Sequence, residues 1–195
     1  MATDSTSAGY LAPSPTPAPD YDRALEDVLQ ALLAALTGLP GTLVRPRWQP
    51  IPPVQPDFET NWLAFGVSNV EADVFASVLH DTSVDSVDSV QRTELVYVLV
   101  SAYGPGGANN LAVVREGLSI SQNREALRTI GANLVECSSF TPVPALMADK
   151  WVRRVDMTIT LRRSITRQYP VLHMLTSGVD LNNELYTTSI STTTP

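Results

Sequence analysis

The feature that most constrains the fold is an alternation of apolar and polar residues between Lys150 and Val171. Five odd positions are apolar, namely Trp151, Val155, Met157, Ile159 and Leu161, and five even positions are polar, namely Arg154, Asp156, Thr158, Thr160 and Arg162. A period of two residues is typical of a β-strand with one face in a core and the other in water. The pattern therefore predicts a long strand with an open face that carries arginine.

Arginine pairs lie at both ends of the alternating part, Arg153 with Arg154 and Arg162 with Arg163, and Arg167 follows. Arginine makes bidentate contacts with carboxylates and stacks on aromatic rings, so it suits protein interfaces. We predict that these five arginines contribute to a subunit or partner interface. Arginine also suits phosphate, which leaves nucleic-acid binding as an alternative, and a charge run can equally be a solvated face.

The charge of the chain is uneven. The net charge is -7, which disfavours non-specific binding to nucleic acid or to an anionic membrane. Acidic residues dominate between Asp57 and Glu94, and three of them, Asp81, Asp85 and Asp88, lie in a segment that reads as a hairpin loop or a protruding β arm. Regions of opposite sign can steer neighbouring molecules head to tail. We therefore count these three aspartates as candidate interface residues; their spacing lacks the glycine and the closing glutamate of an EF-hand.

The sequence contains no recognisable catalytic, metal or cofactor motif. Cys137 is the only cysteine, which excludes an internal disulfide, and His80 and His173 have no neighbouring ligand pattern. There is no nucleophile elbow, and the glycines of 104–107 lack the lysine of a phosphate loop. We expect a protein that is not an enzyme and that has no cofactor. Neither a signal peptide nor an apolar run of about 20 residues is present, so we expect a soluble protein made in a reducing cytoplasm.

The start of the folded part is predicted to be a helix that Asp20 caps and that runs to Thr37, with Gly38 as its stop. Its later turns are apolar nearly all round, because Leu33 and neighbouring alanines add to the leucine stripe. A helix of this kind is buried on two sides. The second side belongs either to its own domain or to a neighbouring subunit, so Leu33 is a further candidate interface residue.

The remaining pattern predicts an α+β fold, with one mostly antiparallel sheet flanked by helices and extended arms at both ends. Residues 92–103 read as a central strand, and helices are expected near 108–117 and from Ser121. The first 19 residues alternate proline with small residues and cannot build a core, so they form a disordered or extended arm. We predict a folded domain over 20–172 and a Ser/Thr-rich extended tail over 173–195.

Four segments together resemble the phage neck terminator, or tail terminator, family of long-tailed bacteriophages. They are NWLAFGV (61–67), SAYGPGG (101–107), REGLSISQNREAL (115–127) and KWVRRVDMTITLRRSITRQYP (150–170), in that order. The resemblance covers residues 20–172 and leaves out the arms. It rests on the ordered set, because none of the segments is chemically diagnostic alone.

The resemblance implies a structural virion protein at the head–tail junction, made in the host bacterial cytoplasm. Such a protein forms a hexameric ring that caps the tail tube, stops its polymerisation and joins it to the head connector. The implied partners are other copies of the chain, the tail tube protein, a head–tail connector, adaptor or collar protein and, in contractile phages, the sheath protein. DNA passes through the channel without specific binding.

Two alternatives remain beside the terminator. Within the same assembly, the chain is a head–tail adaptor or another tail completion protein. From a different class, it is an accessory DNA-binding protein that uses the basic strand, in which case its DNA affinity depends steeply on salt.

Overall fold

The computed structural model describes residues 9–14, 20–51, 53–81, 87–147, 149–171, 176–183 and 186–193. These residues fall into two compact units. The main unit takes its residues from Pro17–Ala76 and Arg92–Ile165. The smaller unit takes its residues from Met1–Thr16, Ser77–Gln91 and Thr166–Pro195.

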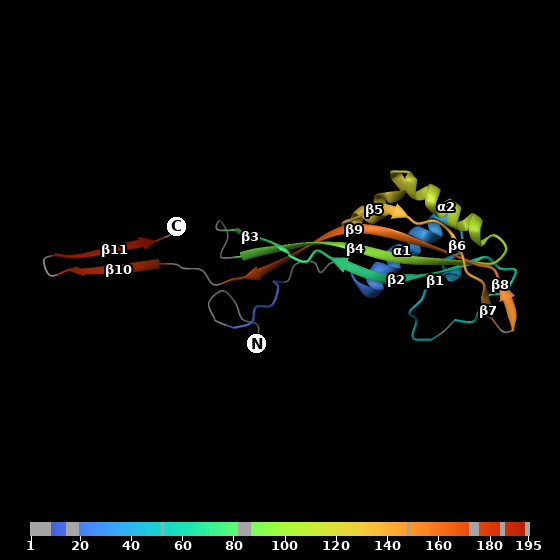
Figure 1. The fold of residues 1–195 in the computed structure, drawn as a ribbon, viewed down its shortest axis with the longest axis horizontal. Coiled ribbons are helices and arrows are strands. Elements are labelled where there is room, and N and C mark those ends of the chain that lie inside the picture. Colours follow the sequence, from blue (N-terminus) through green and yellow to red (C-terminus); the bar gives the residue numbers. More distant parts are fainter. Residues whose placement is uncertain are drawn as a thin grey trace. The chain divides into compact units, whose positions relative to one another are not determined.

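A mixed sheet forms the framework, with its strands in the order β1-β2-β4-β9-β5 (Figure 1). Their bounds are β1 (Val44–Pro46), β2 (Trp62–Ala72), β4 (Val87–Tyr103), β9 (Arg154–Pro170) and β5 (Ala132–Cys137). The strand β1 runs parallel to β2, whereas β2 pairs with β4 and β5 pairs with β9 in antiparallel register. The short β6 (Thr141–Pro142) also pairs antiparallel with β9. The predicted α+β fold with a mostly antiparallel sheet is confirmed, and the valine-rich stretch at 92–103 is the central strand.

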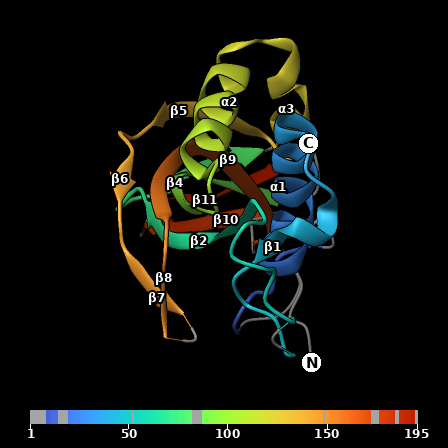
Figure 2. The same ribbon diagram turned by 90° about the vertical axis from the view of Figure 1, so that its right-hand side faces the viewer.

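Three helices cover one side of these strands: α1 (Asp22–Thr37), α2 (Gly107–Ser119) and α3 (Glu125–Thr129) (Figure 2). Two 3-10 turns, η1 (Gly41–Leu43) and η2 (Gln122–Arg124), lie between elements. The hydrophobic core forms where the leucines of the helices meet alternate residues of β2, β4 and β9. The core residues of β4 are Val96, Val98, Val100 and Ala102, and those of β9 are Met157, Ile159 and Leu161. The alternation read from the sequence is therefore that of a strand lying on a helix-covered core.

The helix that Asp20 was predicted to cap begins at Asp22, one residue later than expected. Its N-cap is Tyr21, whose side chain makes no capping hydrogen bond, so the expected cap by Asp20 is wrong. The end is as predicted, because Gly38 adopts a left-handed conformation with φ 71° and its N–H donates to the Ala34 carbonyl at 2.9 Å. A glycine tolerates this conformation without steric penalty, which ends the helix at a defined residue.

The long strand predicted from Lys150 is interrupted at Arg153. The strand β8 (Lys150–Val152) pairs antiparallel with β7 (Ala145–Met147) in a separate hairpin, and β9 begins at Arg154. As a result Trp151 is 74% exposed and does not belong to the core. The alternation of the sequence fails at this point, since the apolar Val152 has an even position and the polar Arg153 an odd one, and the prediction passed over it.

In the smaller unit, β3 (Ser77–Asp81) pairs antiparallel with residues 87–91 of β4. The Ser/Thr-rich tail contains β10 (Thr176–Asn183) and β11 (Tyr186–Thr193), which pair antiparallel with each other. In the predicted N-terminal arm, the N–H of Ser14 donates to the Gln168 carbonyl at 2.7 Å, while residues 1–8 and 15–19 lie outside the described residues. The three-part division at 19 and 172 stays a prediction.

Candidate interaction site

Four side chains from four neighbouring strands form a row on the side of the sheet away from the helices. Trp62 of β2 lies opposite Tyr103 of β4, and their rings stack with centroids 4.1 Å apart and planes 6° apart. The guanidinium carbon of Arg45 lies 5.6 Å from the Trp62 ring centroid, and that of Arg154 lies 5.9 Å from the Tyr103 centroid. Each end of the aromatic pair therefore carries a cation–π contact. We call these four residues the arginine–aromatic row.

A polar network continues from Arg154 along the same face. Arg154 donates to both carboxylate oxygens of Asp156, at 2.8 Å and 2.7 Å, which is the strong bidentate geometry. Arg47 donates to the Ser101 hydroxyl at 2.5 Å. Burial alone would raise the pKa of the Asp156 carboxyl, but hydrogen bonds from Arg154 and Ser101, with the charges of Arg154 and Arg47, lower this pKa below its ordinary value. Asp156 is therefore held as a carboxylate.

A hollow of ≈ 340 Å³ opens beside the row. Three arginines line it, Arg45, Arg47 and Arg154, together with both rings, Pro46 at the end of β1 and Pro53 in the segment that follows. Asp156 neutralises one of the three cations, so the hollow keeps a positive excess. This arrangement suits contact with a carboxylate-bearing surface, because arginine and aromatic residues are enriched where proteins associate.

The Asp156 network gives a pH prediction. The folded-state pKa lies below the ordinary value of 3.8, so the network stabilises the fold above that pH and loses its contribution as the pH falls through the folded pKa. Asp156→Asn should lower the free energy of unfolding by about 1–3 kcal/mol at pH 7. Urea unfolding at several pH values should show this difference shrinking below pH 3.8.

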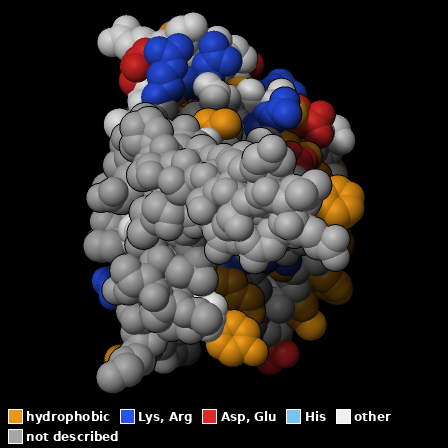
Figure 3. Space-filling model, turned by 90° about the vertical axis from the view of Figure 1, so that its left-hand side faces the viewer, with side chains coloured by type: hydrophobic (Ala, Val, Ile, Leu, Met, Phe, Trp, Pro, Cys, Tyr) orange, Lys and Arg blue, Asp and Glu red, His pale blue; other side chains and the backbone are white. Residues whose placement is uncertain are grey.

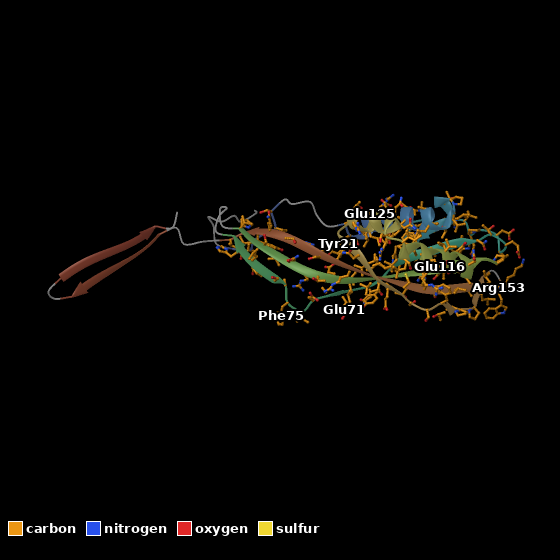
Figure 4. The ribbon with its side chains drawn as sticks, turned by 90° about the horizontal axis from the view of Figure 1, so that it is seen from above. Tyr21, Glu71, Phe75, Glu116, Glu125 and Arg153 are labelled. Atoms are coloured by element: carbon orange, nitrogen blue, oxygen red, sulfur yellow. The ribbon has the colours of Figure 1, made fainter. Side chains whose placement is uncertain are left out.

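The matched control for that measurement is Glu116→Gln, at an exposed carboxyl on α2 (Figure 4). It should change the free energy of unfolding by less than about 0.5 kcal/mol at any pH. A difference between Asp156→Asn and the unmodified chain that stays constant from pH 7 to pH 3 would contradict the role given to the carboxylate charge.

The structure separates the arginines that the sequence grouped together. Arg154 and Arg162 lie on the open face of β9, eight positions apart, whereas Arg163 points the other way because neighbouring residues of a strand face opposite sides. Arg153 lies in the break before β9, is exposed, and its carbonyl accepts a hydrogen bond from the N–H of Gly104. Figure 4 shows Arg153 well separated from Tyr21, the residue on which Arg163 packs.

Arg163 is 3% exposed, so the prediction that it lies on an open face is wrong. Its Nε donates to Glu94 Oε2 at 3.2 Å, and its Nη1 donates to the Asp20 carbonyl at 2.5 Å. The guanidinium also lies 4.2 Å from the Tyr21 ring centroid, and the Tyr21 hydroxyl donates to the second Glu94 oxygen at 2.7 Å. These contacts fasten the start of α1 to β4 and β9. Arg163 therefore serves the fold of this chain.

Leu33 is also part of the chain's own core, at 1% exposure. The prediction that it faces a neighbouring subunit is corrected in favour of the other reading of the all-apolar turns. The helix is apolar on two sides because it packs both on the sheet and on α2.

The candidate residues of the smaller unit have different environments. Asp88 lies 2.5 Å from His80 Nδ1 across the β3–β4 pair, and Arg167 is half buried. Asp81 is the last residue of β3, and Asp85 lies outside the described residues. The interface roles of these residues stay predictions.

The sequence did not point to Arg45, Trp62 and Tyr103 as members of one site. They come from three strands, and only the register of β1, β2 and β4 brings them together. A partial signal was present, since Tyr103 ends the strand predicted over 92–103 and Trp62 lies in the segment NWLAFGV. Among the described residues, no group of three or more histidine, cysteine, aspartate or glutamate side chains is placed to hold a metal ion. No helix in the described part of the chain is long and apolar enough to cross a membrane.

A family model described as phage neck terminator protein matches residues 23–184. This range includes the helices except for Asp22, the first residue of α1, together with the strands from β1 to β9 and the arginine–aromatic row. The chain is accordingly a structural protein of the phage neck and a component of the virion. It belongs to the phage neck terminator protein family, which confirms the resemblance read from the four segments. No curated protein matches the chain.

Proposed function

We propose that this protein is a tail terminator: a hexameric ring that caps the tail tube, stops its polymerisation and joins the tail to the head connector. The observation that carries the proposal is the family match over residues 23–184. Other copies of the chain, the tube protein and a connector, adaptor or collar protein are its proposed partners, with the sheath protein in contractile tails.

A closed ring requires each subunit to offer two different, complementary surfaces, one to each neighbour. Of the predicted interface arginines, Arg153 and Arg162 are exposed and available for such contacts. Arg154 is a poorer probe, because reversing its charge would place a second carboxylate beside Asp156. The Asp81–Val90 segment is the proposed contact with the tube or the channel.

The charge of the chain supports passage of DNA without binding. At a net charge of -7, a ring of these subunits repels DNA as a whole. Among the described side chains visible in Figure 3, basic groups lie next to acidic ones. On α3, Arg128 and Glu125 form an ion pair at 2.6 Å. This mixture is less suited to holding a polyanion than an uninterrupted basic surface would be.

The test is capping of tail tubes. Purified protein added to polymerising tube protein of the same phage should shorten the tubes in proportion to its concentration. Negative-stain images should show a six-fold ring at one tube end, and light scattering should give the mass of any ring free in solution. A monomer in solution is compatible with the proposal as long as tubes are capped, because a ring can also assemble at the tube end.

Tubes of unchanged length, with no density at their ends, would contradict the terminator proposal. Binding to the head connector without binding to tubes would identify the chain as a head–tail adaptor. DNA binding with a steep salt dependence would instead favour the accessory DNA-binding protein.

A further inference from the structure

The β7–β8 hairpin exposes large apolar side chains. Leu146 and Trp151 lie directly opposite each other in its register and are 59% and 74% exposed. An exposed tryptophan beside an exposed leucine is uncommon on a surface that stays in water, and buried tryptophan is a frequent anchor of protein interfaces. The exposed pair of Leu146 and Trp151 is therefore suited to burial against another protein surface.

Positively charged side chains flank the pair of Leu146 and Trp151. Lys150 and Arg153 are both exposed, and within the described residues neither forms an ion pair. Lys150 lies over the Phe58 ring, 4.8 Å from its centroid. The exposed acids nearby are Asp149 at the turn and Glu59, which borders the same hollow as Arg153. A surface that receives the hairpin should therefore combine an apolar wall with carboxylates placed for Lys150 and Arg153.

The main unit carries such a surface on α1. A groove of ≈ 720 Å³ runs between the first turns of α1 and the segment after β1. Its apolar wall consists of Trp48, Pro50 and Ile51, with Trp48 and Ile51 78% and 81% exposed. Its polar wall consists of the charged residues of α1: Asp22, Arg23, Glu26 and Asp27.

The three carboxylates of this groove form no ion pair within the described residues. Partial burial, with repulsion from Asp22 and Asp27, raises the pKa of Glu26 above its ordinary value. The negative charges are thus crowded and outnumber the single arginine. An incoming cation would relieve the crowding, and an apolar side chain would cover Trp48 and Ile51.

The hairpin and the groove belong to different elements of the main unit. Figure 2 shows β7–β8 and α1 on opposite sides of its strands. A subunit therefore offers the hairpin to one neighbour and the groove to another. This is the head-to-tail arrangement that generates rings when the rotation closes.

We propose that the β7–β8 hairpin of one copy of this chain seats in the α1 groove of the next copy. Trp151 and Leu146 cover Trp48 and Ile51, while Lys150 and Arg153 meet the carboxylates of α1. The inference rests on the proposed ring and names its subunit joint.

Directional cross-linking tests the joint. In a Cys137→Ser background, one variant carries Leu146→Cys and a second carries Ile51→Cys. A short bis-maleimide should link the two variants when they are mixed on tail tubes, and neither variant should link to itself. A chain with both cysteines should give a ladder of linked copies that ends at the ring size.

The outcomes distinguish a failure of the proposed joint from a failure of the proposed ring. Capped tubes without mixed cross-links would overturn the joint and leave the terminator function standing. Self-linking of Leu146→Cys would overturn the joint in favour of a two-fold contact between hairpins, and cross-links to the tube protein would make that protein the occupant. A chain that neither caps tubes nor cross-links would overturn both proposals.

An assembly measurement without cross-linking tests the same joint. Trp151→Ala should raise the concentration needed for half-maximal assembly about thirty-fold, as expected for a central interface tryptophan. Its control is Ile120→Ala, at an exposed apolar residue after α2, which should change this concentration by less than about three-fold. Equal effects of the two variants would overturn the joint.

Discussion

An Arg163→Ala variant should unfold with a free energy about 3–5 kcal/mol lower than that of the unmodified chain. The substitution leaves Glu94 buried at 8% exposure without its cation. It also removes the hydrogen bond to the Asp20 carbonyl and the contact with the Tyr21 ring. For a chain of this length, thermal unfolding should show the midpoint falling by about 6–20 °C.

Two further variants make this result specific to the buried pair. Arg162→Ala, at the next residue of β9, removes an exposed arginine and should change the free energy of unfolding by less than about 0.5 kcal/mol. Replacing both partners, Arg163→Met with Glu94→Leu, should recover most of the loss, because a buried ion pair is often no more stable than an apolar pair of similar size. If the double replacement is as unstable as Arg163→Ala, the loss comes from the contacts with Asp20 and Tyr21.

The position of Arg163 illustrates what a sequence pattern leaves undetermined. The alternation in β9 assigns residue 163 to the core side, with Met157, Ile159 and Leu161, while its charge argues for the open side. The conflict is resolved by Glu94, which lies 69 positions away in the sequence. Burial of an arginine is tolerated when a partner satisfies it, and a partner so distant is visible only in the folded chain.

Local signals were more reliable. The leucine stripe of α1 and the glycine at its end act within a few residues, and both the helix and its stop were predicted from them. The valine-rich centre of β4 was likewise recognised, because its composition alone indicates a central strand. A helix or strand whose formation depends only on residues within one segment can be predicted from the sequence of that segment.

The interaction site depends on pairing between segments. The stack of Trp62 on Tyr103 requires the register of β2 on β4, and the exposure of Trp151 requires the break at Arg153 and the pairing of β8 with β7. The sequence pointed to arginines as interface residues. It did not show which of them share a surface, because that is decided by contacts between strands far apart in the chain.

A Gly104→Ala variant should lose about 2–5 kcal/mol of unfolding free energy, for two separable reasons. Gly104 has φ 95°, which strains any residue with a side chain. A Cβ at this position would lie 2.6 Å from the Thr60 carbonyl oxygen and 2.7 Å from Asn61 Oδ1. The clash falls on the turn after Tyr103, where the N–H of Gly106 donates to Asn61 Oδ1 at 2.7 Å. Urea unfolding of the variant measures the combined cost.

Two other glycines separate the conformational cost from the steric cost. Gly38→Ala meets open space at φ 71° and should lose only the conformational part, about 1–2 kcal/mol. Gly41→Ala has open space without a positive φ, so it should be neutral or stabilise the chain by up to about 1 kcal/mol. The excess loss of Gly104→Ala over Gly38→Ala therefore measures how firmly Thr60 and Asn61, the two residues before β2, are held beside this turn. If that excess is close to zero, the two residues move aside at little cost, and the turn that follows Tyr103 is not fixed by them.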